Sequence, residues 1–236
     1  MPVEAADVLR VVALAAFAGG TSFLGALLSR YIRFRSSQIL FLTSFGAGIL
    51  ISAAIFEMVI HAEEAIGIVL TLAFFVIGSI VFTLADVVAE RKGGGAGILL
   101  GIGLDTIPES LAIGASLASG SGLAIAILIG IQNVPEGIAS YREMLAGMTA
   151  FNNSRKALGA IGIVSVIPIA LALAGLFYLQ GMDTVIAVTL ALSAGGIFYM
   201  LFYDMIPKAH KERKWLPTFG SVLGFIIGFV FVRLIG

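Results

Sequence analysis

The sequence predicts an all-α membrane protein with eight transmembrane helices, and three observations carry this prediction. Of its 236 residues, 59% are hydrophobic and only 12% are charged, whereas a soluble domain carries about 25% charged residues. The apolar residues gather in runs of about the 20 residues that a helix needs to cross a ~30 Å hydrocarbon core. The connections between the runs are too short to form a soluble domain, so we expect one membrane domain over residues 1–236.

The runs follow one another with short polar or glycine-containing connections. The start, MPVEAADV, is acidic where a secretory signal peptide would be basic, so we interpret the first run as a membrane span. The sequence has no cysteine, which excludes disulfides and thiolate metal ligands. The expected limits of the spans are 8–28, 38–60, 65–88, 96–118, 122–146, 158–179, 183–206 and 216–235.

The lysines and arginines predict how these spans are oriented. Only Arg10 and Arg233 fall on one side of the expected membrane, and the other twelve of the fourteen basic residues fall on the opposite side. Basic loops stay in the cytoplasm, so we expect both termini to be extracytoplasmic. The twelve residues are Arg30, Arg33, Arg35, Arg91, Lys92, Arg142, Arg155, Lys156, Lys208, Lys211, Arg213 and Lys214.

A short polar pattern occurs twice in the middle of the chain. The segment 105–110 reads Asp-Thr-Ile-Pro-Glu-Ser, and 27 positions later the segment 132–137 reads Gln-Asn-Val-Pro-Glu-Gly. In each copy the first polar residue and the glutamate are four positions apart, so they share one face of a helix. A carboxylate inside a bilayer costs at least ~2.5–3.5 kcal/mol and by default marks an ion or substrate path.

The predicted topology places the two copies opposite each other. The spans 96–118 and 122–146 form an antiparallel hairpin, and Glu109 and Glu136 each lie near the middle of their span. Each glutamate follows a proline, which removes one backbone hydrogen bond and frees a carbonyl. Kinked helices with free carbonyls beside carboxylates are typical of a membrane cation site.

A second, weaker repeat flanks this hairpin. Gly48 is followed nine positions later by Glu57, and Gly195 is followed nine positions later by Asp204, at an offset of 147 residues. The two spans run in opposite directions, so Glu57 lies near the outer face and Asp204 near the inner face. This pattern predicts a three-plus-two-plus-three arrangement with inverted repeats, which is typical of alternating-access carriers.

These features resemble the ZIP (Zrt/Irt-like) family of divalent metal transporters. The resemblance rests on the paired Pro-Glu motifs, the eight spans, and the Phe45–Gly48 and Ser193–Gly196 segments. It implies metal transport toward the cytoplasm across a prokaryotic inner membrane or plasma membrane, and a homodimer. It also implies a metal site, and further residues that either form a second metal site or contact the ligands of the first. The implied metal ligands are Asp105, Glu109, Gln132 and Glu136, and the further residues are Thr106 and Asn133.

The sequence departs from the family pattern at three positions. Asp105 replaces a histidine, Thr106 replaces an asparagine, and Ile167 occupies the place where we expect a sixth-span glutamate before Pro168. Oxygen ligands favour Mn²⁺, Mg²⁺ or Fe²⁺, although Zn²⁺ and Cd²⁺ also bind carboxylate clusters tightly. Because three carboxylates cannot neutralise two divalent ions, we expect one metal at the core.

Four further residues are expected along the ion path. We predict that Glu57 and His61 collect cations at the entrance, and that Asp204 and His210 receive them at the exit. The divalent metal is expected to be the substrate rather than a cofactor, and we expect the lipid bilayer but no nucleic acid as a partner.

Three other functions are compatible with parts of this pattern. A cation channel or a proton-coupled carrier would use the same fold. An intramembrane aspartyl protease could use Asp105 and Asp204, but the order of their motifs along the chain is reversed and Glu109 and Glu136 would have no role. We therefore expect a transporter and no enzymatic activity.

Overall fold

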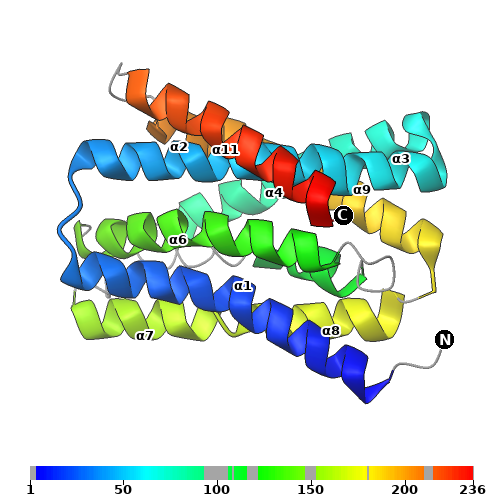
Figure 1. Cartoon of the computed structure of the whole chain (residues 1–236), viewed down its shortest axis with the longest axis horizontal. Helices are drawn as coiled ribbons and strands as arrows, with labels where there is room; N and C mark the ends of the chain where they lie inside the picture. The colour runs from blue at the N-terminus through cyan, green and yellow to red at the C-terminus, as the bar shows by residue number, and fades with distance from the viewer. Residues whose placement is uncertain are drawn as a thin grey trace.

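The computed structural model is almost entirely helical over the residues that it describes. It describes residues 4–92, 106–107, 109–115, 122–146, 153–179, 181–209 and 215–235, and no strand occurs in these ranges. The long helices lie roughly side by side along one direction (Figure 1). The elements are α1 (Ala5–Tyr31), α2 (Ser36–Ala53), η1 (Ala54–Val59), α3 (Ile60–Ile66), α4 (Ile68–Lys92), α6 (Gly122–Ala146), α7 (Ser154–Val164), α8 (Ile167–Leu179), α9 (Asp183–Met200), η2 (Leu201–Met205), α10 (Ile206–Ala209) and α11 (Trp215–Ile235).

Seven helices in the described part of the chain are long and apolar enough to cross a membrane. They correspond to all the expected spans except the fourth, 96–118, most of which lies outside the described residues; within it, residues 109–115 are helical. The second span is longer than expected, because α2, η1 and α3 continue as one helix over Ser36–Ile66. The sixth span is interrupted at Ser165 and Val166, between α7 and α8.

Two glycines make the sharp turns at one end of the molecule. Gly67 between α3 and α4 has a φ of 78°, and Gly181 before α9 has a φ of 77°. This left-handed region costs glycine little and other residues more. The N-terminal end of α1 and the C-terminal end of α11 point toward this same end (Figure 1). We call it the α3 end.

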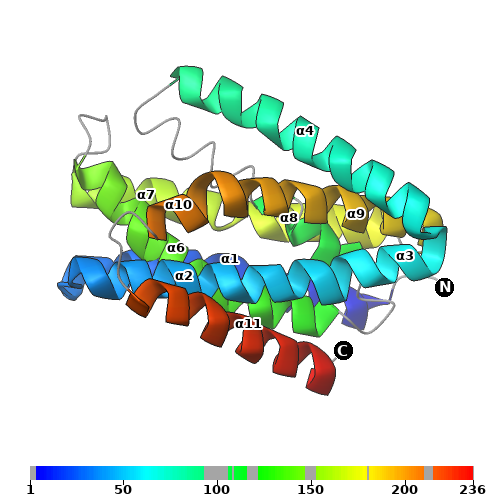
Figure 2. The ribbon, with the colours of Figure 1, turned by 90° about the horizontal axis from the view of Figure 1, so that it is seen from above.

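The helices pack in two groups. In the first group, α1 packs on α6, α7 and α8; in the second, α2 packs on α11, and α4 packs on α9. The main contact between the groups is α2 against α6. Figure 2 shows α4 at the edge of the molecule, diverging from the other helices toward its C-terminal end. The hairpin helix α6 packs mainly on α1 and also contacts α2.

Close backbone contacts at glycines hold each group together. In the first group, a Cβ atom at Gly25 would overlap the Val134 carbonyl, and one at Gly137 would overlap the Ser22 carbonyl. In the second group, a Cβ at Gly195 would overlap the Phe75 carbonyl. Membrane helices associate through small residues that allow such close approach. Between the groups the approach at Gly46 is less close, because a Cβ there would lie 3.3 Å from Pro135 Cγ and 3.6 Å from the Gln132 carbonyl oxygen.

Candidate metal centre

Helix α6 brings three of the predicted residues into the interior of the molecule. Gln132 is 1% exposed and Asn133 is 7% exposed, while Glu136 is partly buried. Pro135 lies inside this helix, and its missing N–H leaves the Ile131 carbonyl without its usual helical donor. Polar groups and a broken backbone ladder therefore occur together in an otherwise apolar helix.

Gln132 and Glu136 form one pair on the side of α6 that faces α2. The Gln132 Nε2 atom donates a hydrogen bond to Glu136 Oε2 at 3.1 Å. The other end of the amide, Gln132 Oε1, is buried and has no hydrogen-bond partner. Gly46 of α2 makes room here, because a Cβ at this position would lie 3.4 Å from Gln132 Cγ. The pair thus presents one carboxylate and one unsatisfied oxygen.

Asn133 points to a different side of α6, toward α1. Its Nδ2 atom donates to the Ala18 carbonyl at 2.9 Å, and its Oδ1 atom is buried without a hydrogen-bond partner. Because the amide nitrogen is committed to Ala18, the oxygen is the end left for another ligand. An unsatisfied buried acceptor costs ~1–3 kcal/mol, so each of these two amide oxygens needs an explanation.

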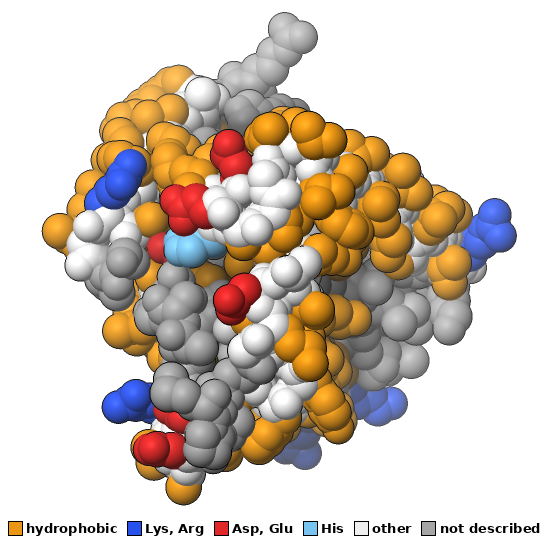
Figure 3. Space-filling view, turned by 90° about the vertical axis from the view of Figure 1, so that its right-hand side faces the viewer, with side chains coloured by type: hydrophobic (Ala, Val, Ile, Leu, Met, Phe, Trp, Pro, Cys, Tyr) orange, Lys and Arg blue, Asp and Glu red, His pale blue; other side chains and the backbone are white. Residues whose placement is uncertain are grey.

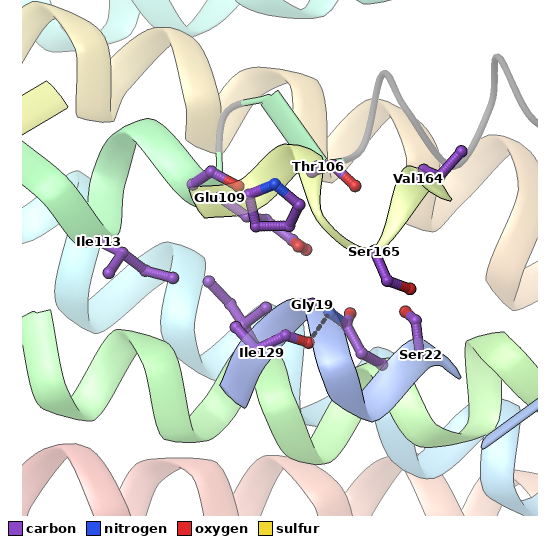
Figure 4. Close-up of a pocket in the computed structure, with 12 residues that line it drawn as sticks. Gly19, Ser22, Thr106, Glu109, Ile113, Ile129, Val164 and Ser165 are labelled. Atoms are coloured by element: carbon purple, nitrogen blue, oxygen red, sulfur yellow. Dashed lines mark hydrogen bonds between the residues drawn. The ribbon is translucent and has the colours of Figure 1, made fainter. Parts of the chain in front are cut away.

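Glu109, Thr106 and Asn133 line one pocket. Glu109 is 4% exposed, and Thr106 is partly buried. In Figure 4 the labelled side chains of Thr106, Glu109 and Ser165 surround this space, and Ser22 of α1 approaches it from below. The cavity volume is about 10 Å³, which is near the lower limit for holding one water molecule. The other lining residues are Ala18, Gly19, Ser110, Ile113, Ile129, Val164 and Pro168.

The sixth span meets this pocket through Ser165, not through Ile167. The break between α7 and α8 turns Val164, Ser165 and Pro168 toward the pocket, whereas Ile167 is 39% exposed and does not line it. The expectation that residue 167 occupies a ligand position is therefore wrong. Ser165 Oγ is buried without a hydrogen-bond partner. The sequence feature that could have indicated this role of Ser165 is Pro168, because a proline breaks a helix and so changes which residues face inward.

The predicted entrance and exit acids lie in segments with the same unusual backbone conformation. Glu57 lies in the π-helical segment η1 and Asp204 in the π-helical segment η2. The segments begin at Ala54 and Leu201, which are 147 positions apart, as are the two acids. π-helical turns are rare and occur often at functional sites. The structure thus gives the weaker sequence repeat a structural counterpart.

Glu57 does not reach the surface as its position near a span end suggests. It is 1% exposed, while His61, one turn further in α3, is partly buried. The α3 end of the molecule displays acidic side chains next to a histidine (Figure 3), and His61 is the one histidine in the part of the chain that the structure describes. Asp204 is partly buried, and His210 lies outside the described residues.

The structure therefore brings the predicted site residues together in two sets. Gln132 pairs with Glu136, and Thr106, Glu109 and Asn133 share the pocket. Among the described residues, no three His, Asp or Glu side chains are close enough together to hold a metal ion. Asp105, the third acid of the predicted site, lies outside the described residues. Amide and hydroxyl oxygens therefore supply much of what the described part of the site offers a cation.

One comparison with known proteins identifies a family. The family model described as ZIP Zinc transporter matches residues 88–236. This match covers more than half of the chain and includes both Pro-Glu motifs and the broken sixth span. No curated protein matches the chain.

Proposed function

Because the chain belongs to the ZIP zinc transporter family, whose members transport divalent metal ions, we propose that it carries a divalent transition-metal ion toward the cytoplasm. The family and the apolar helices make it a multi-pass membrane protein of metal ion transport. We propose that it acts as a transporter and has no enzymatic activity. The ion is cargo in this proposal and not a resident cofactor. The candidate ions are Zn²⁺, Mn²⁺, Fe²⁺ and Cd²⁺.

The proposed binding site consists of Asp105, Glu109, Gln132 and Glu136. The observation that carries it is the buried Gln132 Oε1 atom, which has no hydrogen-bond partner although Gln132 Nε2 is held by Glu136. A metal ion between the amide oxygen and the carboxylate would satisfy both. The all-oxygen ligand set replaces part of the hydration shell of a cation, and it favours harder ions such as Mn²⁺ over Zn²⁺.

The proposed ion path begins at Glu57 and His61 and ends at Asp204 and His210. Burial of Glu57 at 1% exposure supports a role inside the path rather than at its rim. The π-helical turns at Glu57 and Asp204 support the same interpretation, because a turn of this kind re-aims side chains and loosens the backbone ladder.

Alternating access in this proposal is a movement of the first helix group against the second. The first group carries Gln132 and Glu136, and its helices meet at glycines through their backbones. The segment 109–115, which begins with Glu109, packs on α8 of this group, because a Cβ at Gly114 would overlap the Ala172 carbonyl. At Gly46, between the groups, the two atoms nearest to an added Cβ would instead be side-chain atoms of Pro135 and Gln132, at 3.3 and 3.4 Å. Side-chain contacts can exchange partners during sliding more easily than interlocked backbones can.

The remaining features of the proposal follow from the sequence. The distribution of Lys and Arg supports cytoplasmic loops at the end opposite the α3 end, with both termini outside. The proposed location is a cell membrane, either the inner membrane of a prokaryote or a plasma membrane. The chain acts as one transmembrane domain, and the family resemblance supports a homodimer.

Uptake of metal into liposomes tests this function. The purified chain in liposomes should accumulate Mn²⁺, Zn²⁺ or Cd²⁺ with saturable dependence on concentration, whereas empty liposomes should not. Saturation and acceleration by an opposing metal gradient distinguish a carrier from a channel. Absence of uptake for every divalent ion tested would contradict the proposal.

A further inference from the structure

The described part of the pocket beside Glu109 offers several neutral side-chain oxygen atoms and one charged group. Among the described residues that line it, Glu109 is the one charged side chain, while Thr106, Asn133, Ser165 and Ser22 bring neutral oxygens. A divalent ion in a low-dielectric interior needs more than one negative charge to offset its desolvation. A monovalent cation is balanced by one carboxylate. The charge of the pocket therefore fits a monovalent ion.

Two buried oxygen atoms in this pocket have no hydrogen-bond partner. They are Asn133 Oδ1, from α6, and Ser165 Oγ, from the break between α7 and α8. Asn133 is 7% exposed, and its amide nitrogen is held by the Ala18 carbonyl at 2.9 Å. Turning the oxygen away from the pocket would break that hydrogen bond. The two elements thus hold acceptors in place around the same small space.

The break in the sixth span leaves a backbone carbonyl beside the pocket without its usual helical donor. Val164 lines the pocket, and its carbonyl cannot receive the usual helical hydrogen bond because residue 168 is a proline. The Ser165 carbonyl lies against Gly19 of α1, where a Cβ atom would overlap it. Figure 4 shows the turn that carries Ser165 above the helix that carries Gly19. Interrupted membrane helices with free carbonyls are a recurrent way to bind Na⁺ in transporters.

The size of the pocket and the overall charge both favour a small cation. The cavity volume of about 10 Å³ fits one dehydrated small ion, and K⁺ is larger than Na⁺. Asp105, Glu109 and Glu136 together carry three negative charges. One divalent ion neutralises two of them, and one monovalent ion neutralises the third. A proton would need one carboxylate and would leave the oriented oxygens of Asn133 and Ser165 unexplained.

We propose that the pocket formed by Thr106, Glu109, Asn133 and Ser165 binds Na⁺, and that this Na⁺ is a coupling ion for metal transport. Glu109 contributes to both ions, so occupancy of one site changes the charge felt by the other. The coupling role rests on the proposed transport function, whereas Na⁺ binding does not.

Binding of radioactive Na⁺ to the purified full-length chain tests the site directly. We expect saturable binding that excess unlabelled Na⁺ displaces and that K⁺ and choline do not. Ser165→Ala should raise the Kd for Na⁺ at least about tenfold, because a bond from a hydroxyl to an ion contributes more than the ~1.4 kcal/mol that corresponds to tenfold. Thr106→Val, which keeps the side-chain shape, should also raise it and serves as the second variant if Ser165→Ala does not fold.

Ser52→Ala is the matched control for Ser165→Ala. Ser52 is also a buried serine whose hydroxyl has no hydrogen-bond partner, but it lies in α2 against Gly228, in the other helix group. Its Kd for Na⁺ should equal that of the unmodified chain. Absence of saturable binding up to about 0.15 M, the physiological ionic strength, would overturn the proposal, as would binding that neither Ser165→Ala nor Thr106→Val weakens.

Metal uptake measured with and without Na⁺ separates this inference from the proposed function. In liposomes with Mn²⁺ as the transported ion, an inward Na⁺ gradient should increase the initial uptake rate relative to choline. Uptake that is present but equal in Na⁺ and choline, or that responds to a pH gradient in place of Na⁺, would overturn the coupling role and leave metal transport intact. Absence of uptake together with saturable Na⁺ binding would contradict the transport function and not the Na⁺ site.

Discussion

Gln132 and Glu136 lie one helical turn apart on α6, and the Gln132 Nε2 atom donates to Glu136 Oε2 at 3.1 Å. This bond orients both side chains and leaves Gln132 Oε1 buried without a hydrogen-bond partner. A carboxylate and an amide oxygen are thus held ready on one face of the helix before any ion arrives.

Removing the charge of either central glutamate should prevent metal binding. Glu109→Gln and Glu136→Gln keep the side-chain volume and each remove one negative charge. Metal affinity should fall by more than about 100-fold, since changes outside the ligand shell alone cost 10–100-fold. Titration of the purified protein with Mn²⁺ measures this. Glu64→Gln, at an exposed residue of α3, is the control and should bind normally; undiminished binding by both site variants would show that the site is elsewhere.

Replacing Gln132 with histidine should change which metal is preferred. Zn²⁺ favours nitrogen ligands more than Mn²⁺ does, and residue 132 already presents its side chain next to Glu136. Gln132→His should therefore raise the ratio of Zn²⁺ to Mn²⁺ affinity, by about tenfold for ~1.4 kcal/mol of added preference. Competition between the two ions measures the ratio. An unchanged ratio would mean that residue 132 does not contact the metal.

Metal uptake should decrease as the pH decreases. Carboxylates bind a metal in their deprotonated form, so protons and metal compete for Glu109 and Glu136. The apparent metal affinity is therefore highest at the upper end of the range from about pH 5 to about pH 7.5 and falls toward the lower end. Uptake rates at several metal concentrations and pH values measure it. An affinity that stays constant over this range would argue against carboxylate ligands.

Two glycines of α1 should respond in opposite ways to the same substitution. A Cβ at Gly25 would overlap the Val134 carbonyl, whereas one at Gly20 meets no atom within 4 Å. Gly25→Ala should destabilise the protein by about 1–3 kcal/mol through overpacking. Gly20→Ala should leave stability unchanged or increase it by up to ~1 kcal/mol, because alanine is the better helix former. Thermal unfolding in detergent compares them, and equal effects would contradict the packing of α1 on α6.

A cross-link between the two helix groups should stop transport. Ile49 of α2 and Leu128 of α6 belong to one buried cluster that joins the groups. Because the chain has no cysteine, an Ile49→Cys, Leu128→Cys pair can be linked selectively with a flexible thiol reagent. Linking should abolish uptake, and reductive release should restore it. The control pair Ala53→Cys, Val232→Cys lies in the same cluster but within the second group, so linking this pair should leave uptake unchanged. Uptake that survives the link between Ile49→Cys and Leu128→Cys would exclude relative motion of the groups.

The sequence by itself determined the membrane spans and the local part of the site. Hydropathy and helix length depend on consecutive residues, so α1, α6, α9 and α11 occur close to where the apolar runs predict them. The four-residue spacing of Gln132 and Glu136 places them on one face of a helix in any environment, and their hydrogen bond confirms it. Family membership also follows from the motifs, because the matched region contains both of them.

Only the tertiary structure decided which side of each helix faces the interior. In a bilayer both the buried and the lipid-facing sides of a helix are apolar, so hydrophobic periodicity does not distinguish them. The structure therefore decided that Ser165 rather than Ile167 lines the pocket, because the break before Pro168 rotates the chain. It also decided that Glu57 is buried in a π-helical turn and that Asn133 is held by Ala18. These contacts join residues far apart in sequence, and they depend on how closely glycine-containing backbones approach, which no local pattern specifies.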